Sequence, residues 1–310
     1  MKSPHVNIKI VVFIVSLLFL FLNMKSSYAQ GCSDAGFCTI HSLKPDDQEE
    51  EINRNHLSAG ISYGKGENSI SIISPYIEYT RNISSSWAIS GKILYSSIKG
   101  DLANVSGLSD AFISSSYVIG KQTGVTLGVK IPFDDGNSIA GGLPLPMSYQ
   151  KSLGTVDLIA GVNHSYENFE FMAAVQQPLT QNKNQFSALL YPAGSEAEKY
   201  ISTLNYKRMA DVLVRASYTF TLERGKFKII PGILPIFHIA EDKYTDTNGI
   251  EQSISGSQGV TINANLFLIY SIDSKNSFEF SFGAPVKSRT ARPDGLTRKF
   301  AFALEYKASF

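Results

Sequence analysis

The sequence has few charged residues, which make up 18% of its 310 residues, against about 25% in an ordinary soluble domain. Its 28 Lys and Arg residues nearly balance its 27 Asp and Glu residues, for a formal net charge of +1. A chain with so little net charge has no global field to attract a polyanion, so we exclude a nucleic-acid partner.

Long apolar runs are also scarce, and the one that exists lies at the N-terminus, where residues 11–22 follow two lysines. A dozen residues span about 18 Å of helix, short of the ~30 Å hydrocarbon core, so a cleaved export signal is favoured over a permanent anchor. Small residues end at Ala29, which predicts a signal peptide over residues 1–29 and a mature chain beginning at Gln30. No later stretch approaches the ~20 apolar residues of a membrane helix, so membrane insertion must use strands.

Aromatic residues, by contrast, are plentiful, with 19 Phe and 15 Tyr. Apolar and polar residues alternate with a period of two in many segments bounded by Gly, Asn, Asp and Ser, which predicts strands. Twelve segments fit this pattern: residues 55–64, 69–80, 87–98, 108–119, 124–132, 154–166, 169–177, 207–221, 226–240, 259–272, 277–286 and 298–310. The sequence therefore predicts an all-β fold, a transmembrane antiparallel up-and-down β-barrel of about twelve strands over residues 54–310.

The links between these strands alternate in length. Every second link is tight: residues 81–86, 120–123, 167–168, 223–225 and 273–276. Most of the others are long: residues 100–107, 133–153, 178–206, 241–257 and 287–297; residues 65–68 form a short exception. Short periplasmic turns and long extracellular loops are typical of an outer-membrane barrel, whereas a soluble sandwich has no reason to sort its loops this way.

The last strand carries the clearest alternation, because every even position from residue 300 to residue 310 is apolar and every odd one is small or charged. One face of such a strand meets lipid and the other faces the lumen. As an edge strand of a soluble sandwich it would be an aggregation hazard. Its apolar series resembles the signal that the outer-membrane barrel-assembly machinery recognises, and comprises Phe302, Leu304, Tyr306 and Phe310. We therefore expect a bacterial outer-membrane location, with membrane lipid and this machinery as partners.

Between the signal and the barrel lies an N-terminal segment, residues 30–53, which holds the two cysteines of the chain, Cys32 and Cys38. In an oxidising compartment a local disulfide is expected. Free thiols, a metal site and a lipid anchor on Cys32 remain alternatives, although His41 alone is too little for a metal and Ala29 stands where a lipoprotein signal usually carries Leu. The segment either plugs the barrel lumen or lies in the periplasm.

Catalytic chemistry finds little support in the sequence. A triad would need a His near a Ser and an acid; alternation turns His164 outward, and His238 faces the lumen as an ordinary polar side chain. The loop around Asp134 and Asp135 could bind Ca²⁺, but it lacks the regular ligand series and closing Glu of a calcium loop, so a solvated turn is favoured. The sequence predicts no enzyme, no metal and no cofactor.

The ninth predicted strand is unusual because Pro231 and Pro235 cannot donate hydrogen bonds to the ladder. Apolar lumen wall beside a locally broken ladder would suit a hydrophobic substrate path or a sideways exit into lipid; the alternative is a bulge that only shapes the barrel. The substrate path that we predict comprises Ile230, Pro231, Leu234, Pro235, Ile236, His238 and Phe267.

Several short motifs suggest a family. They are Gly107-Leu108-Ser109-Asp110-Ala111 followed by Tyr117, then Gly128-Val129-Lys130-Ile131-Pro132 before a Gly-rich loop, and Leu153-Gly154-Thr155-Val156-Asp157. Together they resemble the outer-membrane transporters associated with the meta-pathway of phenol degradation, relatives of the long-chain fatty-acid channel family. The sequence departs from that pattern at Phe133-Asp134, where Thr-Gly is usual. The resemblance implies passive uptake of small hydrophobic or aromatic compounds, with an N-terminal plug and a lateral exit.

The function that we predict is thus an outer-membrane channel, expected to be monomeric, for passive uptake of small hydrophobic or aromatic compounds. Two other classes stay open: a non-specific diffusion pore or structural or adhesion barrel, and a barrel enzyme that acts on lipid.

Overall fold

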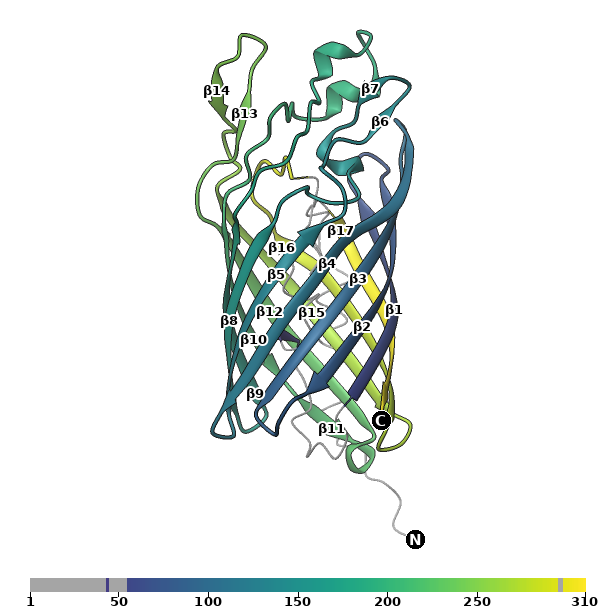
Figure 1. Ribbon diagram of the computed structural model, residues 1–310, viewed down its shortest axis with the longest axis vertical. Helices are drawn as coiled ribbons and strands as arrows, with labels where there is room; N and C mark the ends of the chain where they lie inside the picture. The colour runs from purple at the N-terminus through teal and green to yellow at the C-terminus, as the bar shows by residue number, and fades with distance from the viewer. Residues whose placement is uncertain (1–42, 45–54, 295–297) are drawn as a thin grey trace.

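Twelve antiparallel strands close into a barrel in the computed structural model, which describes residues 43–44, 55–294 and 298–310 (Figure 1). The barrel strands are β1 (Asn55–Gly66), β2 (Ser71–Asn82), β3 (Trp87–Lys99), β4 (Asn104–Ile119), β5 (Thr123–Pro132), β8 (Asp157–Tyr166), β9 (Phe169–Pro178), β10 (Asp211–Tyr218) continued by β11 (Phe220–Leu222), β12 (Phe227–His238), β15 (Gly259–Ser271), β16 (Asn276–Lys287) and β17 (Arg298–Ser309). No helix of the described residues is long and apolar enough to cross a membrane. The predicted all-β barrel of about twelve strands is confirmed.

The barrel closes where the first strand meets the last. β1 pairs with β17 from His56↔Ser309 to Gly66↔Arg298, and β1 also pairs with β2 on its other side. At the seam the imidazole of His56 lies 2.7 Å from the Ser309 hydroxyl. Closure leaves no open sheet edge, which is the condition for crossing a bilayer with strands.

Side chains alternate between the two faces of the wall, as the period-two pattern predicts. In β17 the even-numbered Phe302, Leu304 and Tyr306 are exposed on the outer face, whereas Glu305 between them is only 3% exposed inside. Phe310, just past the strand, is also exposed. The apolar outer face and the polar, charged lumen fit a barrel surrounded by lipid. The role of this series in barrel assembly stays a prediction.

Loop lengths also follow the expected parity. Tight turns gather at one end of the barrel, where the C-terminus lies, and the long loops gather at the other (Figure 1). These long loops contain the short strands β6 (Ile139–Ala140), β7 (Leu143–Pro144), β13 (Lys243–Thr245) and β14 (Glu251–Ser253), and the one-turn helices η2 (Met147–Tyr149), η3 (Ala188–Leu190) and η4 (Glu196–Lys199). A further turn, η5 (Glu223–Gly225), belongs to the tight end.

Three predicted strand starts were wrong. β4 begins at Asn104 rather than residue 108, because Gly107 has an extended φ of 158° and the strand runs through it. β8 begins at Asp157 rather than residue 154, because Gly154 has a left-handed φ of 69° and packs on the Asp135 backbone. β10 begins at residue 211 rather than 207, because Lys207 instead forms an isolated bridge with a long loop.

The predicted signal peptide and the Cys32–Cys38 bridge lie outside the described residues. Of the N-terminal segment, Leu43 and Lys44 are described, and both are buried, at 0% and 5% exposure. They contact lumenal side chains of the barrel, which are considered below.

Replacing a lipid-facing leucine by a charge tests the outer face. Leu127, near the middle of β5, is 56% exposed, and Leu127→Arg is expected to lower the free energy of unfolding in lipid vesicles by about 2–4 kcal/mol. The control, Leu190→Arg, places the same change in a long loop where Leu190 is 52% exposed, and it should leave the urea midpoint nearly unchanged. Equal losses for the two variants would contradict the lipid-facing assignment.

Candidate ligand cavity in the barrel lumen

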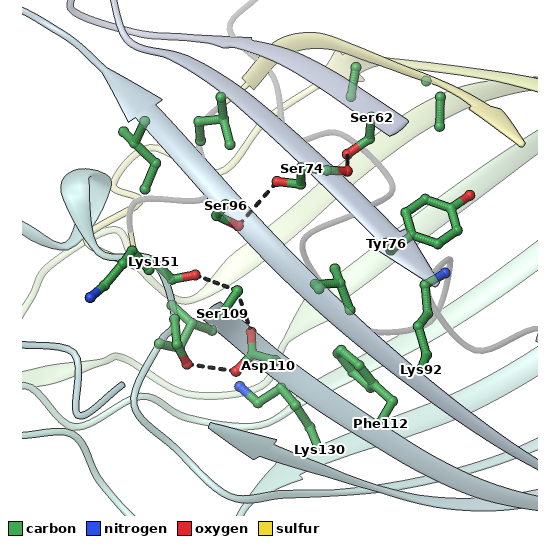
Figure 2. Close-up of a pocket in the computed structure, with 18 of the residues that line it drawn as sticks. Ser62, Ser74, Tyr76, Lys92, Ser96, Ser109, Asp110, Phe112, Lys130 and Lys151 are labelled. Atoms are coloured by element: carbon green, nitrogen blue, oxygen red, sulfur yellow. Dashed lines mark hydrogen bonds between the residues drawn. The ribbon is translucent and has the colours of Figure 1, made fainter. Parts of the chain in front are cut away.

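A cavity of about 150 Å³ lies in the lumen below η2. Residues of β1 to β5 line it, and several of them are labelled in Figure 2. The adjoining strands β17, β16 and β15 and Lys44 of the N-terminal segment also contribute to the lining. The volume is of the order of an apolar cavity that holds a benzene molecule. The cavity is therefore large enough for a monocyclic compound.

Serines form much of the polar side of the cavity. Ser62, Ser74 and Ser96 succeed one another across β1, β2 and β3, and Figure 2 shows them in a row. The Ser74 and Ser96 hydroxyls lie 3.1 Å apart, and the Ser62 hydroxyl donates to the Ser74 carbonyl at 3.3 Å. Small side chains that satisfy one another keep this side open while presenting hydroxyl oxygens to a ligand.

Two lysines on the same wall are held by acids outside the cavity lining. The ammonium of Lys92 lies 3.7 Å from the centre of the Tyr76 ring and 3.3 Å from Glu78. Lys130 lies 3.0 Å from Asp157, which is also buried. Since each buried ammonium has an acid beside it, the wall carries charge without an uncompensated buried cation.

The facing side of the lumen carries an apolar cluster among buried polar and charged side chains. A buried cluster joins residues of five strands with the N-terminal segment, and it comprises Leu43, Phe112, Ile159, Met172, Ala174, Leu213, Leu234 and Ile236. Leu43 fits against the wall because Gly161 has no side chain: an added Cβ would lie 2.9 Å from a Leu43 methyl group. Phe112, Leu94 and Phe267 also line the cavity. A ligand there would meet hydroxyls on one side and hydrocarbon on the other.

Tyr76 of β2, at the floor of this cavity, contacts the two strands on either side of the barrel seam, β1 and β17. Its ring crosses Gly60 of β1, where an added Cβ would lie 2.4 Å from the ring, and its hydroxyl donates to Glu305 of β17 at 2.6 Å. Glu305 pairs across the strands with Glu279 of β16. The ammonium of Lys44 lies 2.8 Å from Glu305 and 3.1 Å from Glu279.

The helical turn η2 covers the cavity on the side of the long loops. Tyr149 of this turn is fully buried, and Gly100 leaves room for its hydroxyl, which an added Cβ would approach to 2.3 Å. Below the turn, the Ser152 hydroxyl donates to Asp110 at 2.6 Å. A second space of about 150 Å³ above η2 shares Met147 and Ser148 with the first. These two residues therefore separate an outer space from the inner cavity.

A buried ionic cluster holds the long loops over the barrel mouth. His238 at the end of β12 lies 2.7 Å from Asp211 and 2.8 Å from Asp242 through its two ring nitrogens. Carboxylate oxygens accept hydrogen bonds, so both nitrogens donate when both bonds form, and the ring is then an imidazolium. Arg289 from the last long loop lies 3.8 Å from Asp242 and also contacts Asp294.

The same cluster shifts the ionisation of the loop residues that enter it. Burial raises the pKa of the Tyr206 hydroxyl well above its ordinary value, and Asp242 and Asp294 raise it further. Burial alone would lower the pKa of Arg208, but Asp211 and Asp157 raise the pKa overall. Tyr206 thus stays neutral and Arg208 stays charged across the physiological range.

The wall is incompletely paired between β16 and β17. Their cross-strand pairs run from Asn276↔Ala308 to Gly283↔Ala301, although β16 continues to Lys287 alongside β15. Pro285 in this part of β16 has no N–H group to donate. The cavity lining here includes Phe302, which is 39% exposed on the outer face. The cavity therefore reaches the wall at the last cross-strand pairs, Phe282↔Phe302 and Gly283↔Ala301, beside the stretch where the pairing of the two strands ends within the described residues.

The predicted substrate path is divided among three places. Leu234 and Ile236 belong to the cluster that contacts Leu43, while Ile230 packs with Phe267, which lines the cavity. His238 belongs to the ionic cluster instead. Along β12 the pairing with β15 is continuous from Phe227 to His238, whereas the pairing with β10 and β11 skips the positions of both prolines, Pro231 and Pro235.

The other sequence candidates take ordinary positions. His164 is exposed on the outer face, 3.0 Å from the Thr123 hydroxyl. Asp134 forms an ion pair with Lys151 at 2.7 Å and accepts from the backbone of Gly136, which is turn geometry. Among the described residues, no three His, Cys, Asp or Glu side chains converge as metal ligands.

Alternation places Glu279 and Glu305 in the lumen, as the structure does, but sequence reasoning missed the charged residues of the cavity wall. Inward parity in β2, β3 and β5 could have indicated Glu78, Lys92 and Lys130, since each lies on the buried face of its strand. No signal could have indicated Lys44, because it belongs to no strand and its partners lie more than two hundred residues away.

No protein-family model matches the sequence, and no curated protein matches it either. Among solved structures, an outer membrane channel from Pseudomonas putida is similar at a TM-score of 0.57 and 13% identity, over 86% of this chain and 99% of that one. A monoaromatic hydrocarbon channel has a TM-score of 0.45 at 10% identity, over 93% of this chain and 95% of that one. A toluene transporter from Ralstonia pickettii has a TM-score of 0.45 at 9% identity, over 92% and 96%. The first likeness shows that the chain has the fold of an outer-membrane β-barrel channel.

The crossing of Tyr76 over Gly60 can be tested with an added methyl group. Gly60→Ala would displace the Tyr76 ring and break its bond to Glu305, so the free energy of unfolding should fall by about 1–3 kcal/mol. In the matched control, Gly91→Ala, the new Cβ meets nothing within 4 Å, and urea titration should give a change within about 0.5 kcal/mol. Equal changes in the free energy of unfolding for the two variants would contradict the stabilising role of the Tyr76 crossing.

The bridge from His238 to Asp242 is expected to hold down the long loop that follows β12. His238→Asn cannot contact both acids, so proteinase K should cut residues 239–258 several-fold faster in the folded barrel. His164→Asn is the control, because His164 lies on the outer face and its loss should not alter the cutting rate. Unchanged cleavage in His238→Asn would show that the loop is held by other contacts.

Proposed function

We propose that the protein is a bacterial outer-membrane channel for passive uptake of small hydrophobic or aromatic compounds. The single observation that carries this proposal is the lumenal cavity of about 150 Å³, which has an apolar side formed by Leu94, Phe112 and Phe267 and a hydroxyl side formed by serines. Ligand sites for small molecules are concave and mostly apolar with a few polar groups that fix orientation, and this cavity has that character.

The route through the protein would have three parts. A compound would first occupy the outer space above η2, lined by Tyr200 and Ile201 among others, and then pass Met147 into the inner cavity. The stretch beyond Gly283↔Ala301, where the pairing of β16 and β17 ends, would offer a way into the lipid next to the cavity. That step lowers the free energy of a hydrophobic compound, because the compound moves from a partly polar cavity into hydrocarbon.

The location follows from the fold and from the sequence together. A polar lumen, an apolar outer face and long loops at one end fit the outer membrane, and the predicted export signal over residues 1–29 would direct the chain there. The series that ends at Phe310 would be read by the barrel-assembly machinery, and the closed barrel would act as a monomer. A disulfide between Cys32 and Cys38 would form in the periplasm. The resemblance to transporters of the phenol meta-pathway supports aromatic substrates.

A non-specific pore is the second candidate, and it is disfavoured by the lumen itself. Leu43 and Lys44 lie inside the barrel, and the cluster around Leu43 spans several strands. These two residues occupy part of the lumen that an open diffusion pore would leave to water. A lipid-acting enzyme is disfavoured because both ring nitrogens of His238 face carboxylates rather than a serine.

Filling the cavity tests the proposal. Ser96, 6% exposed, lines the cavity, so Ser96→Trp should lower uptake of a labelled monocyclic aromatic compound at least tenfold in cells that depend on this chain. Ser85→Trp, in an exposed tight turn, is the control and should transport normally. If Ser96→Trp folds as a barrel and still takes up the compound, the cavity is not part of the route. In a separate assay, swelling of liposomes that contain the wild-type protein in stachyose would favour the open pore.

A further inference from the structure

We propose that Glu279 and Glu305, held by Tyr76, form a binding site for a primary ammonium group, which Lys44 of the same chain fills in this structure. The inference rests on the proposed channel function for its consequence, which is that an apolar primary amine admitted to the lumen would compete with Lys44 for this site. The site itself is argued from the barrel wall.

The two carboxylates face each other directly. Glu279 and Glu305 are cross-strand partners on β16 and β17, and both point into the lumen. Like charges in that position repel, and Glu305 is only 3% exposed, so water screens the repulsion poorly. The ammonium of Lys44 relieves it by lying 2.8 Å from one carboxylate and 3.1 Å from the other. The pair therefore favours a cation at this point.

The wall holds one acceptor oxygen, that of Glu305, in place without help from Lys44. Tyr76 reaches across Gly60 and donates to the same Glu305 oxygen that accepts from Lys44. The ring of Tyr76 is in turn covered by the ammonium of Lys92, 3.7 Å from the ring centre. An acceptor group fixed by neighbours on three strands loses little further freedom when a ligand binds.

The distances suit an ammonium group better than a metal ion. Oxygens at 2.8 and 3.1 Å are at N–H···O hydrogen-bond length, whereas Mg²⁺ and Ca²⁺ take six or more oxygens at about 2.0–2.6 Å. Among the described residues no third acid or histidine joins the pair as a metal ligand. A primary ammonium has three donors on a narrow stem, and Lys44 shows that such a stem fits.

The site becomes more negative when Lys44 is removed. Glu78, Glu279 and Glu305 supply three carboxylates, and Lys44 and Lys92 supply two ammonium groups. Without Lys44, the carboxylates keep Lys92, which already contacts Glu78 at 3.3 Å, and the more distant guanidinium of Arg215, which is itself paired with Glu170. The excess of negative charge would attract a cation of the size of the missing ammonium.

The cavity specifies what the rest of the ligand should be. Lys44 lines the cavity together with Phe112 and Phe267. A ligand whose ammonium replaced that of Lys44 would extend its other end into this partly apolar space. The geometry thus favours a primary alkylamine or arylalkylamine over a quaternary amine, which has no N–H donor, and over a neutral alcohol, which has no charge.

Chemical rescue of Lys44→Ala tests the site with the full-length protein. n-Propylammonium chloride replaces the side-chain atoms that the substitution removes, so it should raise the urea midpoint of the purified variant towards that of the wild type. Its affinity for Lys44→Ala, measured by calorimetry, should be at least tenfold higher than for the wild type. Equal concentrations of tetramethylammonium chloride and of n-propanol should rescue neither property.

Two matched variants complete the test. Adding Glu279→Gln and Glu305→Gln to Lys44→Ala should abolish binding of n-propylammonium, and Lys207→Ala, which removes an exposed ion pair with Glu251, should gain no affinity for it. Equal binding to wild type and Lys44→Ala, or binding that survives both Glu→Gln changes, would overturn the proposal.

If Lys44→Ala does not fold in detergent, the same comparison is made during refolding. The yield of heat-modifiable barrel on gels should rise with n-propylammonium and stay low with tetramethylammonium; equal yields would also overturn the proposal. Aromatic uptake by cells is measured separately. If the variant binds the amine but cells show no aromatic uptake, the proposed channel function is wrong and the ammonium site stands. If cells take up aromatic compounds but the variant does not bind the amine, the ammonium site is wrong and the channel function stands.

Discussion

The structure depends on one constraint: hydrocarbon offers no hydrogen bonds, so every backbone group that crosses the membrane must be paired within the protein. Pairing of β1 with β17 completes a ring of strands and meets this constraint. Alternation along each strand then divides the side chains, and those that cannot face lipid must fit inside a narrow lumen. The lumenal charges are therefore close together, and each needs a partner; the ionic cluster at the mouth and the Lys44 contacts follow from that crowding.

These lumenal contacts also divide the interior into regions with different chemistry. The acids and arginines near His238 lie towards the long loops, the cavity with its serines and aromatic rings lies below η2, and Glu279 and Glu305 lie at its floor. A hydrophobic compound could occupy the middle region without displacing an ion pair. A compound with an ammonium group would have to displace Lys44 before it could contact Glu279 and Glu305. The lumen therefore treats neutral and cationic ligands differently.

The sequence predicted the fold closely because its signals are local. Period-two alternation and loop parity identified all twelve strands, and the inward orientation of Leu234, Ile236 and Phe267 followed from alternation alone. The cavity could be predicted only in part, because its shape depends on residues far apart in sequence. The contact of Lys44 with Glu305 and the crossing of Tyr76 over Gly60 are set by how the strands curve and close, and no periodic pattern encodes them.

The crossing of Tyr76 over Gly60 has a consequence for the order of assembly. Tyr76 belongs to the second strand of the barrel and Glu305 to the last, and they meet only across the first strand. Glu279 and Glu305 already lie side by side on neighbouring strands, but the hydroxyl that orients Glu305 arrives only when the two ends of the sheet join. The complete site for Lys44 is therefore a property of the finished barrel, because a sheet still open at the seam has the two carboxylates without the Tyr76 hydrogen bond.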